Sequence, residues 1–271
     1  MAAPLDFSDL TGKKKTTVQT PPQQTNAQGF YSPQEIPQKK NEEKHIMKNM
    51  GYPTTKSENG DELLQLFPIP ILICPYPIDY SKELEWIKNK ECRKENTGAD
   101  AGNGKVHYNR QSEDTFVLDR PELANIRAFI EAKLHEYATK IMASDDKLVI
   151  TQSWLNKNKK GESHHEHVHP NSMISGVWYP QIHEQMPPIQ FMRNGQRDVS
   201  LSIDQFNTFN SATFVLPVKK GELILFPSNI FHSVPANKDD EERISLSFNT
   251  WVKGNLGDIA HKTYVPLDRC I

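Results

Sequence analysis

From Lys147 onward, short apolar runs alternate with turns, which is the pattern of a β-rich domain. The apolar runs are rich in β-branched and aromatic residues, and Gly, Pro, Asn and Asp separate them, so strands are favoured over helices. Strands are predicted at 148–156, 172–180, 188–192, 198–203, 211–216, 222–226 and 242–252. Several short strands at this spacing, after a helical section, predict a barrel or a two-sheet jelly roll.

A helix is predicted ahead of the strand-rich region. Apolar residues from Leu123 to Ile141 recur at three- and four-residue spacing, so one face of the helix should pack on the core. Asp119 is the predicted N-cap, with Pro121 in the first turn. Upstream, the predicted elements are a strand at 63–74, a short helix at 81–91 capped by Asp79, a loop at 94–112 and a strand at 115–118.

Polarity divides the chain into three parts. Residues 1–62 have few apolar side chains, so this stretch is predicted to be disordered or to order on a protein partner. Residues 63–252 are predicted to form the folded domain, and residues 253–271 a C-terminal extension.

Composition restricts the compartment and the partners. The chain has 271 residues and a formal net charge of −2, so neither nucleic acid nor an anionic membrane is indicated as a partner. No apolar run reaches the roughly 20 residues of a membrane span, and the N-terminus lacks the features of a secretory signal. The three cysteines are scattered, which predicts a cytoplasmic setting. The oligomeric state stays open, with a homo-oligomer among the possibilities.

Histidines are concentrated between a glycine turn and an apolar strand. Four of the ten histidines fall between His164 and His169. Residues i and i+2 of an extended segment point to the same side, and imidazole binds iron, zinc, copper and nickel. The candidate pairs are His167 with His169, His165 with His167, and His164 with Glu166. The alternative is a solvated histidine-rich loop that binds no metal.

Two further candidates follow in the C-terminal third. His232 lies just beyond an apolar strand that ends at Pro227, and it can supply a third ligand. Residues 241–249 alternate strictly, which places Arg243, Ser245, Ser247 and Asn249 on one face of a strand. A guanidinium on a barrel strand needs an anion. That anion is either an Asp or Glu across the sheet or the carboxylate of a small acid bound beside the metal.

Taken together, these motifs resemble those of a known family. They are Leu66-Phe67-Pro68-Ile69-Pro70, Ser153-Trp154-Leu155-Asn156, His167-Val168-His169-Pro170-Asn171-Ser172, Gly221 through Phe226-Pro227-Ser228 to His232, and Glu242-Arg243-Ile244-Ser245. In this order they are similar to the 2-oxoglutarate- and Fe(II)-dependent oxygenases, and more narrowly to oxygenases common in phages and bacteria. The resemblance covers about residues 63–252. It implies a mainly β fold with flanking helices, the double-stranded β-helix or jelly roll.

The resemblance also implies a cofactor site. Its cofactors would be Fe(II) and 2-oxoglutarate, with His167, His169 and His232 as metal ligands and Arg243 on the far carboxylate of 2-oxoglutarate. The family has an acid where this chain has His169, so His164 with Glu166 is the alternative pair. Supporting contacts to 2-oxoglutarate are expected from Asn156, Asn158, Ser245 and Asn249, and Tyr179 or Trp178 is expected to line the pocket.

Three functions are compatible with these residues. The resemblance implies a dioxygenase that hydroxylates or otherwise oxidises an unknown substrate. A three-histidine zinc site that activates water in a hydrolase is the second reading. A non-enzymatic jelly-roll module, such as a structural component of a phage virion, is the third.

Overall fold

The computed structural model describes residues 54–56, 59, 61–64, 66–99, 104–193 and 202–267. The chain divides into two compact units after Pro68. In the first unit, strand β1 (Thr54–Lys56) pairs antiparallel with β2 (Glu62–Leu64). Most of the predicted N-terminal tail, 1–62, lies outside the described residues. The same is true of 198–201 in the predicted strand 198–203 and of the end of the C-terminal extension.

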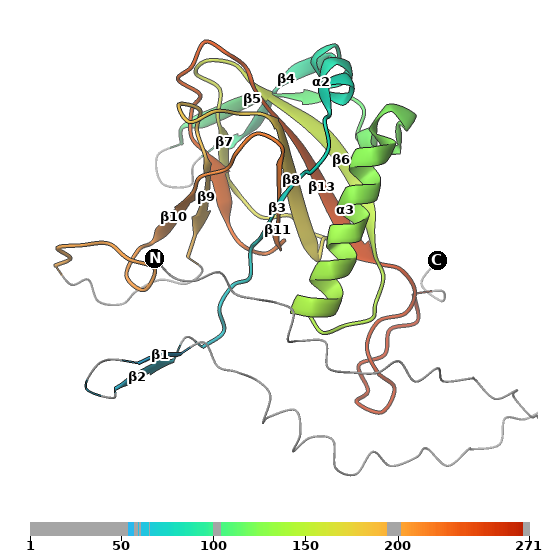
Figure 1. Ribbon diagram of the computed structural model, residues 1–271, viewed down its shortest axis with the longest axis vertical. Helices are drawn as coiled ribbons and strands as arrows, with labels where there is room; N and C mark the ends of the chain where they lie inside the picture. The colour runs from blue at the N-terminus through green and yellow to red at the C-terminus, as the bar shows by residue number, and fades with distance from the viewer. Residues whose placement is uncertain are drawn as a thin grey trace, which may run out of the picture. The chain divides into compact units, whose positions relative to one another are not determined.

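The second unit, from Ile69, is built on two antiparallel sheets that face each other (Figure 1). The larger sheet has the order β3-β11-β8-β13-β6-β5-β4, and the smaller has the order β10-β9-β12-β7. The larger sheet comprises β3 (Leu72–Pro75), β4 (Cys92–Ala99), β5 (Val106–Ser112), β6 (Leu148–Asn158), β8 (Ile174–Gln181), β11 (Glu222–Pro227) and β13 (Arg243–Val252). The smaller sheet comprises β7 (His164–His167), β9 (Ile189–Met192), β10 (Thr213–Leu216) and β12 (His232–Val234).

The chain winds between the two sheets as it runs from β6 to β13. Strands β6, β8, β11 and β13 lie in the larger sheet, and β7, β9, β10 and β12 lie in the smaller one. Successive strands therefore cross between sheets, except at the antiparallel β9–β10 pair. This is the winding of a double-stranded β-helix, so the predicted mainly β jelly roll with flanking helices is confirmed.

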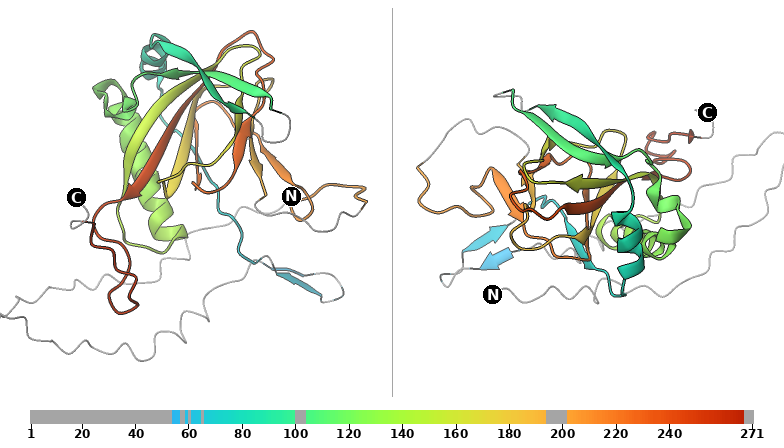
Figure 2. Two further views of the ribbon diagram at one scale, coloured as in Figure 1. Left: turned by 180° about the vertical axis from the view of Figure 1, so that it is seen from behind. Right: turned by 90° about the horizontal axis from the view of Figure 1, so that it is seen from above.

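The predicted amphipathic helix is present as α3 (Ala124–Glu136), followed by a π-helical turn at Tyr137–Ile141. It lies along the outer face of the larger sheet (Figure 1, Figure 2). Its Ile126, Ile130 and Leu134 are fully buried in the same core as Leu155 and Phe248 of the sheet. The predicted apolar face is thus the face that packs on the strands.

The predicted N-caps were wrong for both helices. Asp119 ends a 3-10 turn (Val117–Asp119), a second turn (Pro121–Leu123) follows it, and Leu123 occupies the cap position of α3. In α2 (Ser81–Lys88) the cap is Tyr80, and Asp79 instead accepts a hydrogen bond from the Ser81 hydroxyl at 2.7 Å.

The stretch predicted as a loop at 94–112 is instead the hairpin β4–β5, which extends the larger sheet beyond β6. The apolar pattern of the sequence did not indicate this hairpin, because β4 is an edge strand with mostly exposed, polar side chains. The predicted strand at 115–118 is only a single bridge between Phe116 and Ser153. The predicted strand at 63–74 is interrupted between β2 and β3, where Pro68 and Pro70 cannot donate to a ladder.

The apolar residues form two cores on the two faces of the larger sheet. Trp178 of β8 packs on the helical side, whereas its neighbours Val177 and Tyr179 pack between the sheets with Ile224 and Phe226. Alternation along β8 therefore decides which of its side chains can reach the interior of the jelly roll. The histidines line a cavity in that interior, together with Val177 and Tyr179 of β8.

Candidate metal centre and its cavity

Three histidines predicted as ligands converge at the smaller sheet. His167 ends β7, His232 begins β12, and the two residues are antiparallel partners in the ladder. His169 follows β7 and is held by a backbone hydrogen bond to the Ser228 carbonyl at 3.0 Å. The nitrogens of His167, His169 and His232 lie within 4.8 Å of one another, a spacing at which they can share one ion.

The imidazoles are held in the tautomer that a metal requires. The Nδ1 atoms of His232 and His167 lie 3.0 Å and 2.9 Å from the backbone oxygens of Ile230 and His165, so each donates there and leaves a lone pair on Nε2. The Asn249 side chain hydrogen-bonds to His169 and fixes the third ring. The protein thereby orients all three ligands before an ion arrives.

The distance between His169 and His232 indicates which coordination geometry an ion between them would have. Their Nε2 atoms lie 3.1 Å apart, and two lone pairs at this distance repel unless a cation or a proton lies between them. Two nitrogens about 2.1 Å from one ion lie about 3.0 Å apart at a right angle and about 3.4 Å apart at a tetrahedral angle. The spacing therefore fits two neighbouring ligands of a six-coordinate ion better than two ligands of tetrahedral zinc.

Burial keeps these rings neutral. Desolvation lowers the pKa of His169 to about 4 and holds the pKa of His232 well below its ordinary value, and the neighbouring histidines lower both further. Burial also lowers the pKa of His167. A neutral imidazole is the form that binds a metal.

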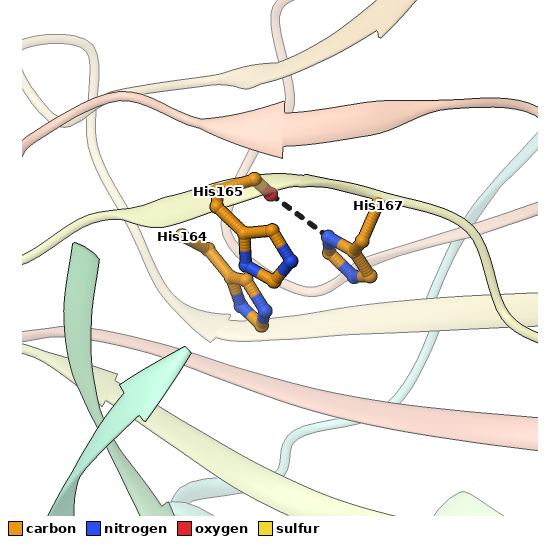
Figure 3. Close-up of side chains that lie close together, drawn as sticks. All are labelled: His164, His165 and His167. Atoms are coloured by element: carbon orange, nitrogen blue, oxygen red, sulfur yellow. Dashed lines mark hydrogen bonds between the residues drawn. The ribbon is translucent and has the colours of Figure 1, made fainter. Parts of the chain in front are cut away.

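A second group lies beside the first. His164, His165 and His167 also bring three nitrogens within 4.8 Å, and Figure 3 shows their rings gathered on one side of β7. Glu166, which would complete the alternative His164–Glu166 pair, is exposed at the surface and belongs to neither group. The carboxylate expected of the family is thus not supplied by this residue in the structure.

The first histidine group opens into a cavity of about 40 Å³ that is partly open to solvent. Side chains of β5, β6, β8, β12 and β13 converge on it. Its polar and aromatic lining consists of Asn109, Trp154, Asn156, Asn158, His164, His167, His169, Tyr179, His232, Arg243, Ser245 and Ser247. The predicted residues Asn156, Arg243 and Ser245 therefore share one cavity with the histidines.

Arg243 is the most unusual residue of this lining. Its side chain is 1% exposed, and its guanidinium donates to the Pro187 carbonyl at 3.0 Å and to Asn158 Oδ1 at 3.3 Å. It lies 5.2 Å from the ring of Tyr179, and burial lowers its pKa. Within the part of the chain that the structure describes, no carboxylate pairs with it. The predicted alternative of an ion pair across the sheet is not found there, so a buried positive charge faces the cavity.

The other predicted residues differ in their placement. Asn156 Oδ1 accepts from Asn109 and Gln111, both at 3.2 Å, and its amide nitrogen donates to Ser247 at 2.9 Å. Asn249 is bound to His169 and to the Ser175 hydroxyl, and it is not among the lining residues. Its position favours orienting the metal ligand over contacting a co-substrate.

Two hydrogen-bonding residues of the lining, Asn109 and Ser247, were given no role in the sequence analysis, and one choice between aromatic residues was left open. Asn109 was hidden in the supposed loop at 94–112, and Ser247 was placed on the correct face but given no role. Between the two aromatic candidates, Tyr179 lines the cavity, whereas Trp178 lies on the opposite face and donates to the Gly221 carbonyl. The alternation of β8 was the signal that separates them.

Comparison with known proteins agrees with this arrangement. Residues 152–249 match the sequence model of a family described as "Putative 2OG-Fe(II) oxygenase". Over this stretch the chain is similar to that oxygenase family. The matched stretch contains both histidine groups and Arg243, so the similarity extends over the whole candidate centre. A search of curated proteins gave no match.

Solved structures resemble the fold of this chain at low identity. An oxidoreductase of the 2OG-Fe(II) oxygenase family from Burkholderia pseudomallei is 15% identical, with 66% of this chain and 84% of that chain covered and a TM-score of 0.47. A prolyl-4-hydroxylase from Pseudomonas putida is 10% identical, with 69% and 94% covered and a TM-score of 0.42. HygX from Streptomyces hygroscopicus, solved with nickel and 2-oxoglutarate, is 10% identical, with 67% and 82% covered and a TM-score of 0.45.

The described residues include several helices. None of the helices found there is long and apolar enough to cross a bilayer.

Proposed function

We propose that this chain is an Fe(II)- and 2-oxoglutarate-dependent dioxygenase that hydroxylates, or oxidises in a related way, a second substrate. The observation that carries the proposal is Arg243. A fully buried guanidinium without a carboxylate partner among the described residues lies in the cavity onto which His167, His169 and His232 open. Hydrolysis at a zinc site needs no such buried cation, whereas a dicarboxylate bound between metal and arginine does.

The donor set suits the proposed cofactors. Three neutral imidazoles leave a divalent iron with its full charge of two. The carboxylate of 2-oxoglutarate beside the iron would offset part of that charge, and the far carboxylate would offset the charge of Arg243. Bound together, Fe(II) and 2-oxoglutarate would supply the activation of O2 for oxidation of the second substrate. The ligand set does not by itself distinguish iron from zinc, copper or nickel, because imidazole binds all four.

The chain's own contribution is binding, orientation and exclusion of water. Hydrogen bonds to backbone carbonyls orient the rings of His167 and His232, and a hydrogen bond with Asn249 orients the ring of His169. Arg243 would hold the far carboxylate of 2-oxoglutarate, with the Tyr179 ring against its guanidinium. The Nδ2 donor of Asn158 is buried without a hydrogen-bond partner in the structure and faces the same cavity, so it is available to that carboxylate.

The test is an anaerobic titration of the purified chain with Fe(II) and 2-oxoglutarate, followed by the weak visible charge-transfer absorption of the chelated iron. We expect the band in the wild type, and its loss in Arg243→Ala and His232→Ala. Arg93→Ala and His261→Ala are matched controls, because both side chains are well exposed, at 72% and 82%.

Each negative result points to a different alternative. No band in a protein that purifies with zinc would favour the hydrolase. No band in a folded protein that binds no metal would favour a non-enzymatic jelly-roll module.

A further inference from the structure

His167 belongs to both histidine groups and lies between them. Its ring centroid is 4.2 Å from that of His164 and 4.3 Å from that of His232. We call His167, His169 and His232 the inner trio, and His164, His165 and His167 the outer trio (Figure 3). The chain thus offers two three-nitrogen sets with one member in common.

We propose that the outer trio is a second binding position for a divalent transition ion such as zinc, copper or nickel, and that its occupation excludes an ion from the inner trio. Three imidazoles are a sufficient donor set for each of these ions. The effect on 2-oxoglutarate described below rests on the proposed function, whereas the binding position itself does not.

The outer trio is held in place by its surroundings. A Cβ at Gly98 would lie 2.7 Å from the Nε2 atom of His165, and Gly98 has a φ of 124° at an irregularity in the β4–β5 ladder. The glycine therefore lets the backbone of β4 approach the imidazole closely. A freely solvated histidine loop needs no such approach, because water would cover its rings.

His164 is also fixed. Its ring stacks on His167 with an interplanar angle of 14°, and its Nδ1 lies 3.3 Å from the Asn109 amide nitrogen. Rotation of that amide would give up its hydrogen bond to Asn156 Oδ1 and present Oδ1, which is buried without a partner in the structure, to an Nδ1–H of His164. In that tautomer the Nε2 atom of His164 carries the lone pair that an ion needs.

The two positions exclude each other because of the hydrogen bond at His167. Its Nδ1 donates to the His165 carbonyl at 2.9 Å, so only Nε2 has a lone pair. One lone pair binds one ion. An ion at the outer trio therefore leaves the inner position with His169 and His232 alone.

This arrangement predicts a metal-dependent control of the proposed oxygenase. An ion at the outer trio would draw His167 away from the cavity in which Arg243 lies. Iron and 2-oxoglutarate would then lose one protein ligand, and their joint binding would weaken. All three outer histidines are half-buried, so an ion can reach them from solvent without opening the jelly roll.

Three double variants test the proposal by calorimetric titration with Zn(II) and metal analysis, each with and without 2-oxoglutarate. His169→Ala/His232→Ala leaves only the outer trio, and His164→Ala/His165→Ala leaves only the inner trio. His164→Ala/His169→Ala removes the same number of imidazoles but leaves neither trio complete, so it is the matched control. Circular dichroism and thermal unfolding establish that each variant is folded.

We expect one ion per chain in the wild type and in the first two variants, and at least tenfold weaker binding in the control. 2-Oxoglutarate should tighten binding only in the inner-trio variant. Two ions in the wild type, weak binding in the folded outer-trio variant, or equal binding in the control would each overturn the proposal. Absence of a 2-oxoglutarate effect in the inner-trio variant would instead contradict the proposed function and leave the outer position standing.

Discussion

His167 and His232 face each other as antiparallel partners on β7 and β12, with their rings 4.3 Å apart. The backbone ladder of the smaller sheet therefore sets the spacing of two ligands that lie far apart in the sequence. His169, just beyond β7, adds the third nitrogen and takes its orientation from Asn249 on the larger sheet. The candidate centre thus joins the two sheets of the jelly roll.

Replacing Arg243 by methionine should separate ligand binding from stability. The substitution removes hydrogen bonds from a charged donor to Pro187 and Asn158, each worth about 1.5–3 kcal/mol, but it also removes an unpaired buried charge, which offsets most of that loss. We expect the free energy of unfolding of the ligand-free protein to change by less than about 2 kcal/mol. The rise in melting temperature caused by 2-oxoglutarate in the presence of Fe(II) should disappear. A variant that keeps this rise would show that the guanidinium does not bind the dicarboxylate.

Replacing Asn249 by alanine should weaken the binding of the metal but not the binding of the co-substrate. The side chain hydrogen-bonds to His169, and partners of this kind typically contribute about 10- to 100-fold to metal affinity. We expect a loss of this size in Fe(II) affinity measured by competition with a chelator. The affinity for 2-oxoglutarate at saturating Fe(II) should be nearly unchanged. A selective loss of 2-oxoglutarate binding would instead support the sequence-based prediction that Asn249 contacts it.

Alkaline pH should destabilise the fold through two tyrosines. Burial raises the pKa of both Tyr137 and Tyr179 to about 12 from the ordinary 10.0, because the charged phenolate is poorly solvated there. The folded state prefers the neutral form, so this stability is complete below pH 10 and is lost as the pH rises from 10 towards 12. Urea unfolding at pH 9 and pH 11 should show the decrease.

Tyr137→Phe provides the check on this pH dependence. It removes the hydrogen bond to the Pro70 carbonyl, worth about 1 kcal/mol, so the variant should be less stable near neutral pH. Its stability should then fall less steeply above pH 10. An unchanged slope would mean that Tyr137 ionises normally in the folded protein.

Gly176→Ala should strain the contact between two central strands. An added Cβ would overlap the ring of Phe248 and lie 2.8 Å from a methyl carbon of Leu225, inside a fully packed core. Overpacking of this kind costs about 1–3 kcal/mol, which denaturant unfolding can measure. Adding Phe248→Leu should recover part of the loss, because the smaller side chain removes the overlap. If the destabilisation caused by Phe248→Leu simply adds to that caused by Gly176→Ala, overlap with the Phe248 ring is not the explanation.

The sequence predicted most of the long strands because their residues are buried and β-branched. Strands β6, β8, β11 and β13 pair in the centre of the larger sheet and carry a strong apolar signal. Strands β7 and β12 are short and rich in histidine and other polar residues. They are strands mainly because they pair with each other, so no local apolar pattern predicts them. Strand β4 was missed because an edge strand needs little apolar surface, and its neighbour β5 was missed because its buried residues, among them His107 and Asn109, are polar.

The candidate ligands were predictable from spacing, and their surroundings were not. His167, His169, His232 and Arg243 follow from extended geometry and from the resemblance to the oxygenases. The contacts of Asn109 and Asn249 depend on which strands become neighbours, which a single sequence does not specify. The link to phages, the partner of the N-terminal tail and the cytoplasmic setting stay predictions.

The crowding of four histidines between His164 and His169 also concerns the unfolded chain. Chelation by neighbouring residues needs no tertiary structure, so the denatured protein can capture transition ions with this stretch alone. Ligands that bind both states stabilise the native one only by the difference in affinity. Metal should therefore raise the melting temperature less than its affinity for the folded protein would suggest. During synthesis, the ribosome exposes this chelating stretch before His232 has been made.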